Sequence, residues 1–136
     1  MQRNFHITQG VELNGDFGRL DIHNAYDFTG YGFVADGQVL RLHFRGNEWK
    51  CEGQPALVQI EFHRVSVLEI NMTSRDLVEL TIDEIGFKES SDRDYDWLSP
   101  KDEGDTHIVF RCVCDSTIRV FAETATVSVF DGRDAH

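Results

Sequence analysis

One acidic segment of the chain has the carboxylate spacing of a calcium-binding loop. If Asp92 is taken as position 1, Asp94 and Asp96 fall at positions 3 and 5, and Glu103 falls at position 12. In an EF-hand these positions supply the oxygen ligands of Ca²⁺. That loop also needs glycine at position 6, where this chain has Trp97, and no helical pattern flanks the segment. These departures favour a solvated acidic loop over a calcium site.

Two of the six histidines could take part in a metal site. His43 and His63 each lie at a polar position of a predicted strand, close in sequence to Arg41 and Glu61. If the two strands are neighbours, the imidazoles could approach each other across one face and act as metal ligands. Polar positions of such strands usually face water, which is the interpretation we favour. We therefore predict no cofactor and no metal, with a small metal-dependent enzyme using His43 and His63 as the alternative.

Signatures of nucleophilic catalysis and of phosphate binding are missing from the sequence. There is no Gly-x-Ser-x-Gly motif, and Gly30-Tyr31-Gly32 lacks the later glycine and the following helix of a phosphate-binding loop. The three cysteines, Cys51, Cys112 and Cys114, are an odd number, which argues against a disulfide framework. We expect them to be reduced and buried as small hydrophobic residues. The sequence thus favours a protein that is not an enzyme.

Exposed-looking aromatic residues near carboxylates are the main functional signal. The segment from residue 88 to residue 106 shows no strand alternation and contains seven acidic and three basic residues. Loops of this length in a small domain are usually functional or disordered. We expect this loop to be exposed and more mobile than the strands. We predict a partner-binding surface formed by Trp49, Asp92, Asp94, Tyr95, Asp96 and Trp97. In the alternative interpretation, each tryptophan closes an open end of the fold.

The net charge restricts the class of partner. The 136 residues include 13 basic and 24 acidic ones, which gives a net charge of −11. Nucleic acids and anionic membranes would be repelled, whereas a basic protein would be attracted. No apolar stretch approaches the roughly 20 residues of a membrane helix. The first residues contain no apolar run typical of a signal peptide, so we expect a cytoplasmic protein.

Alternation of apolar and polar residues runs along most of the chain. It predicts one domain over residues 1–136, an all-β antiparallel sandwich of about eight or nine strands with little helix. A closed or partly open barrel is the alternative. Asp36-Gly37 predicts a hairpin, the phase slip at 65–70 predicts a β-bulge or a change of sheet, and 73–77 is the best candidate for a helical turn. The predicted core includes Ile22, Leu42, Ile60, Phe62, Leu80, Phe110, Val120 and Val127.

The order of several blocks resembles a group of small all-β bacterial proteins. The resembling stretches are 23–27, 39–44, 60–65 with 68–70, and the closing strands from His107 to Val129, so the likeness covers roughly the last 110 residues. These proteins are similar to immunity proteins of polymorphic toxin systems. The resemblance implies a non-catalytic module that binds a toxin and blocks it, here a basic one. A self-associating module, for example a homodimer, is the competing expectation.

Overall fold

The computed structural model describes residues 1–72 and 81–131. These residues form two sheets and one short 3-10 turn, η1 (Val113–Asp115), and they contain no α-helix. The main sheet has the order β5-β6-β7-β10-β9-β8, with β1 beside β10 as its one parallel strand. The small sheet has the order β2-β3-β4 and is antiparallel. The strands are β1 (Gln2–Arg3), β2 (Phe5–Thr8), β3 (Glu12–Gly15), β4 (Gly18–Asp21), β5 (Tyr26–Val34), β6 (Val39–Gly46), β7 (Leu57–Asn71), β8 (Ile82–Lys88), β9 (His107–Cys112) and β10 (Thr117–Phe130).

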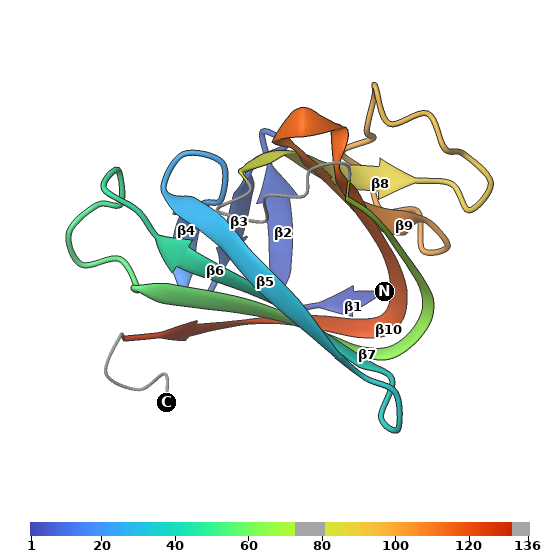
Figure 1. Ribbon diagram of the computed structural model, residues 1–136, viewed down its shortest axis with the longest axis horizontal. Helices are drawn as coiled ribbons and strands as arrows, with labels where there is room; N and C mark the ends of the chain where they lie inside the picture. Colours follow the sequence, from blue (N-terminus) through green and yellow to red (C-terminus); the bar gives the residue numbers. More distant parts are fainter. Residues whose placement is uncertain (73–80, 132–136) are drawn as a thin grey trace.

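The main sheet is curled into a half-barrel whose concave side holds the core. Figure 1 shows β7 and β10 as long, strongly curved neighbours, with β2, β3 and β4 standing against the curl. Leu13 of β3 and Leu20 of β4 belong to the same buried cluster as Leu42 and Phe62 of the main sheet. The small sheet therefore covers the concave face. The predicted all-β antiparallel fold is confirmed, and the two-sheet arrangement combines the packing of a sandwich with the curl of the partly open barrel that was the alternative.

Alternation along the strands correctly predicted which side chains enter the core. Successive side chains of a strand point to opposite faces, so every second residue of β6, β7 and β10 can reach the concave side. The predicted core residues that the structure describes are all buried: Ile22, Leu42, Ile60, Phe62, Phe110, Val120 and Val127. Leu80 and the possible helical turn at 73–77 lie outside the described residues.

The predicted phase slip is a β-bulge in an unbroken strand. Phe121 of β10 pairs with Val67, whereas the next residue, Ala122, pairs with Val65, so Ser66 is the extra residue of β7. Arg64 beside it has a positive φ of 56°. A bulge bends its strand and increases the local twist. This irregularity therefore contributes to the strong curvature that the sheet needs to enclose a core.

Two local predictions have different outcomes. The hairpin at Asp36-Gly37 is confirmed, since it joins β5 to β6. Alternation through Ile108, Phe110 and Cys112 also predicts a strand as far as Cys114. This prediction is wrong, because β9 ends at Cys112 and Cys114 lies in η1. The amide of Val113 donates to the carbonyl of Thr81, and that of Cys112 donates to the carbonyl of Ser116, so the chain turns before β10. Among the described residues, no helix is long and apolar enough to cross a membrane.

Candidate functional site

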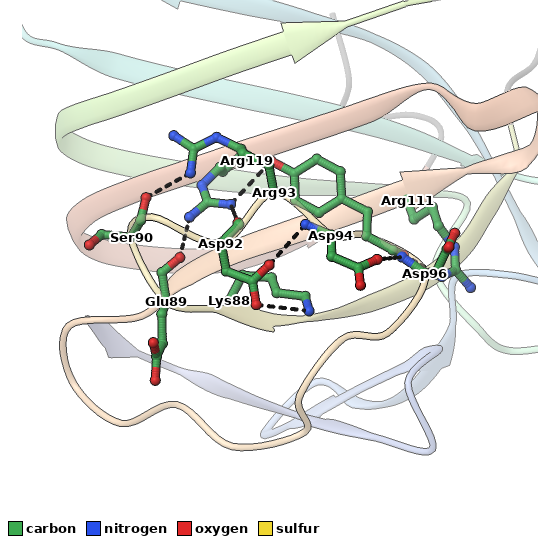
Figure 2. Close-up of polar contacts among 10 residues, drawn as sticks. Lys88, Glu89, Ser90, Asp92, Arg93, Asp94, Asp96, Arg111 and Arg119 are labelled. Carbon is green, nitrogen blue, oxygen red and sulfur yellow. Dashed lines mark hydrogen bonds and ion pairs between the residues drawn. The ribbon is translucent and has the colours of Figure 1, made fainter.

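The loop that joins β8 to β9, residues 89–106, lies against the convex face of the main sheet and is held there by Arg119 of β10. Arg119 points away from the core, yet it is fully buried because the loop covers it. Its Nη2 donates to the carbonyl of Glu89 at 2.5 Å, and its Nη1 donates to the carbonyl of Asp92 at 2.5 Å and to the Tyr95 hydroxyl at 3.1 Å. Figure 2 shows the Arg119 guanidinium pointing toward Glu89 and Asp92 of the loop. One side chain thus fixes three positions of the loop.

His107 provides the remaining partner of this arginine. The Nε of Arg119 donates to Nδ1 of His107 at 2.8 Å, so that nitrogen carries no proton in this arrangement. Burial, and then the neighbouring Arg119 charge, lower the pKa of His107 below its usual value of 6.5. The imidazole is thus held neutral, and in the described part of the chain the hydrogen bonds of Arg119 go to carbonyls, a hydroxyl and an imidazole rather than to a carboxylate.

Two further arginines fasten the loop at its surface. Arg93 of the loop pairs with Glu69 of β7 through Nε at 3.0 Å and Nη2 at 2.7 Å, and it also donates to the carbonyl of Ser90. Arg111 of β9 donates to the carbonyl of Tyr95 at 2.6 Å while it pairs with Asp83 at 3.0 Å. The bidentate contact between Arg93 and Glu69 fixes orientation as well as distance. The first half of the loop is therefore tied to β7, β9 and β10.

The middle of the loop is attached to β8 by its backbone and by one apolar side chain. The amide of Phe87 donates to the carbonyl of Ser99 at 2.8 Å, and the amide of Ser99 donates back at 3.0 Å. Leu98 is buried, and a Cβ placed on Gly86 would lie 2.5 Å from the Leu98 Cβ. Glycine at this position thus allows the loop to approach the strand. Most of the loop is exposed as expected, but these contacts argue against the predicted mobility.

The carboxylates with calcium-like spacing serve the loop itself. Asp92 accepts the amide of Asp94 at 2.9 Å and pairs with Lys88 at 3.3 Å, and Asp94 accepts the amide of Asp96 at 3.1 Å. The backbone hydrogen bond from Asp94, followed by Lys88, lowers the pKa of Asp92. Within the described residues, no group of three or more His, Cys, Asp or Glu side chains could hold a metal ion. These aspartates shape successive turns and leave an acidic surface.

Trp97 projects from this acidic surface. Its side chain is 64% exposed, and the Nζ of Lys88 lies 5.0 Å from its ring centroid. Lys88 is itself buried, between Trp97 and the carboxylate of Asp92. A cavity of about 270 Å³ opens beside the tryptophan and includes Lys101 and Glu103 in its lining. The indole thus stands at the rim of a polar depression.

The structure does not bring Trp49 to the same surface. Trp49 lies in the connection between β6 and β7, where it is 73% exposed and its amide donates to Oδ1 of Asn47. In Figure 1 that connection lies at one end of the long axis of the molecule, and the 89–106 loop lies at the other. The six predicted partner-binding residues therefore form one cluster, Asp92, Asp94, Tyr95, Asp96 and Trp97, plus a distant tryptophan. Both tryptophans are too exposed to close an end of the sandwich.

His43 and His63 lie on neighbouring strands, as the metal alternative requires, but they are not adjacent. His43 is paired with Gln59, whereas His63 lies four residues further along β7, a distance of about 13 Å at 3.3 Å per residue. His63 instead contacts Glu61 at 2.5 Å, and Glu61 accepts a hydrogen bond from Arg41 at 2.6 Å. The hydrogen bond from Arg41 lowers the pKa of Glu61. The arrangement is an exposed ion-pair cluster on the convex face.

The two cysteines whose side chains are described differ in exposure. Cys112 is buried, as expected, and burial raises the pKa of its thiol to about 11. Cys51 is exposed, so the expectation that it is buried is wrong. It lies in the connection after β6, where its amide donates to the side chain of Gln54.

No family model, curated protein or solved structure matches this chain. The site is therefore defined by its geometry alone.

Sequence reasoning missed Arg119 and His107, the two residues that position the loop. Both occupy polar positions of strands, where alternation predicts contact with water. One signal was available: Arg119 stands in the apolar run from Ile118 to Ala122, and an arginine in such a run needs partners if it is covered.

Proposed function

We propose that the protein is a non-catalytic protein-binding module that recognises a basic partner through the 89–106 loop. The partner that best fits this chemistry and the resemblance to immunity proteins is a basic toxin, which the module would inhibit. The observation that carries the proposal is Trp97, an indole 64% exposed on a loop fixed from beneath by Arg119.

Fixation of the loop favours binding because it reduces the entropy lost on association. A mobile loop must be ordered when a partner binds, and that cost is subtracted from the affinity. Here the contacts of Arg119, Arg93 and Ser99 already order the backbone around Trp97. Tryptophan is among the residue types that most often dominate interface energetics. A pre-ordered, exposed indole is therefore suited to be an anchor.

Charge supports a basic partner. Residues 88–106 contain seven acidic and three basic side chains, a net charge of −4 within a chain of −11. Lys88 pairs with Asp92, and Arg93 pairs with Glu69, so a carboxylate accompanies each of these two positive charges. Complementary charge accelerates association and selects against acidic partners. The predicted complex should weaken as salt is added.

The decisive experiment takes the product of the neighbouring gene, which the proposal expects to contain a toxin-like domain, and measures its binding to this protein. The complex is titrated by calorimetry at low and moderate salt with the wild-type protein and with Trp97→Ala. Loss of a tryptophan anchor should reduce the affinity at least roughly 30-fold, which is the effect of a hot-spot residue. Trp49→Ala provides the comparison, because it removes an indole of similar exposure from the connection at the other end of the molecule.

Three results would contradict the proposal. The absence of a complex at low salt would exclude this partner, since steering is strongest there. Equal affinities of the wild type and Trp97→Ala would exclude the loop as the recognition surface. A larger loss with Trp49→Ala than with Trp97→Ala would move the interface to the opposite end.

A further inference from the structure

The main sheet ends in two edge strands, β8 and β5, and they differ in how far other parts of the described chain cover their outer sides. At the β8 edge, the amide of Ile85 donates to the carbonyl of Gly10 at 2.6 Å, and Phe87 exchanges two hydrogen bonds with Ser99. At the β5 edge, the hydrogen bond from the Asn47 amide to the carbonyl of Ala25 only continues the pairing of β5 with β6, so it does not cover the outer side of β5. Within the described chain, no backbone hydrogen bond covers the outer edge of residues 29–34. This stretch is an open strand edge.

The side chains of this open edge are apolar and exposed. Tyr31, Phe33 and Val34 are 47%, 45% and 48% exposed, respectively. Tyr31 is paired with Leu42 and Phe33 with Leu40, so both aromatic rings lie on the concave side, beside the rim of the core. Natural proteins usually protect an open edge with charge, proline or a bulge that turns it away. Here a bulge occurs before Gly30, but no charge or proline lies between Asp27 and Asp36.

We propose that residues 30–34 of β5 pair with the same residues of a second copy of this chain, antiparallel about a two-fold axis at Gly32. This register places Tyr31 of each copy opposite Phe33 of the other. Because directly opposed residues share a face, the four aromatic rings then form one cluster on the concave side. Gly32 would meet Gly32 on the convex side, where a Cβ added to this glycine would have no neighbouring atom within 4 Å. The edge is thus complementary to itself, as a two-fold interface requires.

Charge distribution also favours a second copy at this place. A chain with a net charge of −11 repels its own copies over most of its surface. The segment between Asp27 and Asp36 carries no charge, so two copies can approach here with little repulsion. In this register Asp27 of one copy lies near Asp36 of the other at each end of the paired segment, and these two carboxylates repel each other. Salt should therefore strengthen this dimer, whereas it should weaken the complex with a basic partner.

The first test is sedimentation of the full chain over a wide concentration range at low and high salt. The mass should rise from one chain to two as concentration increases, and less protein should be needed at high salt. Phe33→Lys should raise the dissociation constant roughly a hundredfold, since each dimer contains the substitution twice and a tenfold loss per site is squared. It also reduces the net negative charge, so a general charge effect would act in the opposite direction.

Val129→Lys is the matched control. It changes the net charge by the same amount at another exposed apolar position, on β10, and should leave the dissociation constant unchanged. A protein that stays monomeric at every concentration and at both salts would overturn the proposal. An equal effect of Phe33→Lys and Val129→Lys would do so as well.

The second test places a cysteine on the proposed axis and does not depend on the Phe33 variant. Gly32→Cys is made in a Cys51→Ser background, because Cys51 is the exposed thiol among the cysteines whose side chains are described. In the proposed register the two new thiols lie opposite each other, with Cα atoms about 4.5–5.5 Å apart. A short thiol crosslinker should then yield a covalent dimer. A dimer in sedimentation that does not crosslink at residue 32 would refute the β5 register.

Discussion

Replacing Arg119 by methionine removes the buried guanidinium that holds the 89–106 loop on the sheet while keeping a side chain of similar length. Four acceptors lose their donor: the carbonyls of Glu89 and Asp92, the Tyr95 hydroxyl and Nδ1 of His107. The Arg119→Met variant therefore measures how much these contacts contribute to the stability of the whole domain.

The expected loss of stability follows from two opposing terms. Hydrogen bonds to a charged group contribute about 1.5–3 kcal/mol each, so four of them suggest roughly 6–12 kcal/mol. Burial of the guanidinium costs several kcal/mol, and the freed carbonyls regain water at the loop edge. We expect a net loss of about 2–4 kcal/mol in the free energy of unfolding. For a chain of 136 residues this lowers the Tm by roughly 6–16 °C.

The assay combines urea denaturation with limited proteolysis by trypsin. In the wild type, cleavage after Arg93 and Lys101 should be slow because the loop backbone is attached on both sides. In Arg119→Met these sites should be cut well before the strands unfold. Arg119→Lys should behave similarly, because one ammonium group cannot reproduce the fork of donors.

Arg19→Met is the control for removal of an arginine. Arg19 is 70% exposed and pairs with Glu12 at 3.3 Å, so its replacement should cost at most about 1 kcal/mol. If Arg119→Met is as stable as Arg19→Met and its loop remains resistant to trypsin, Arg119 does not hold the loop and our account of the site is wrong.

Two further predictions concern the contacts around the same loop. The pKa of His107 is lowered in the folded state, so its contribution to stability is present above about pH 6.5 and is lost as pH falls through the folded pKa. Urea denaturation at pH 7.5 and at pH 5 measures how much stability the protein loses on acidification. This loss should be smaller for His107→Gln than for the wild type, because the glutamine amide oxygen can accept from Arg119 without titrating. Equal losses in the two proteins would refute this prediction. Gly86→Ala should lower stability by about 1–3 kcal/mol, because its Cβ would lie 2.5 Å from Leu98. Gly32→Ala, where the added methyl has open space, is the control, and equal Tm values for the two variants would contradict the close packing of the loop.

The sequence by itself determined the strands and the concave core. In β6 and β7, alternation marks Leu42, Ile60 and Phe62 as core residues, and each is buried. The prediction succeeds because strand geometry sends alternate side chains to opposite faces, whatever the sheet order. The sequence also predicted the bulge at Ser66, because an extra residue in a strand shifts the alternation of apolar and polar residues. These are local properties, which neighbouring residues specify.

Tertiary structure alone decided what covers the convex face. Arg119 occupies a position that alternation assigns to water, and it is buried because a loop 24 to 30 residues earlier in the chain folds over it. The same long-range packing ties down an acidic loop that composition predicts to be mobile, and it places Trp49 and Trp97 at opposite ends. Such contacts depend on sheet order and curvature. The spacing of neighbouring residues carries no information about them, because a strand has the same period whether its polar side faces solvent or a distant loop.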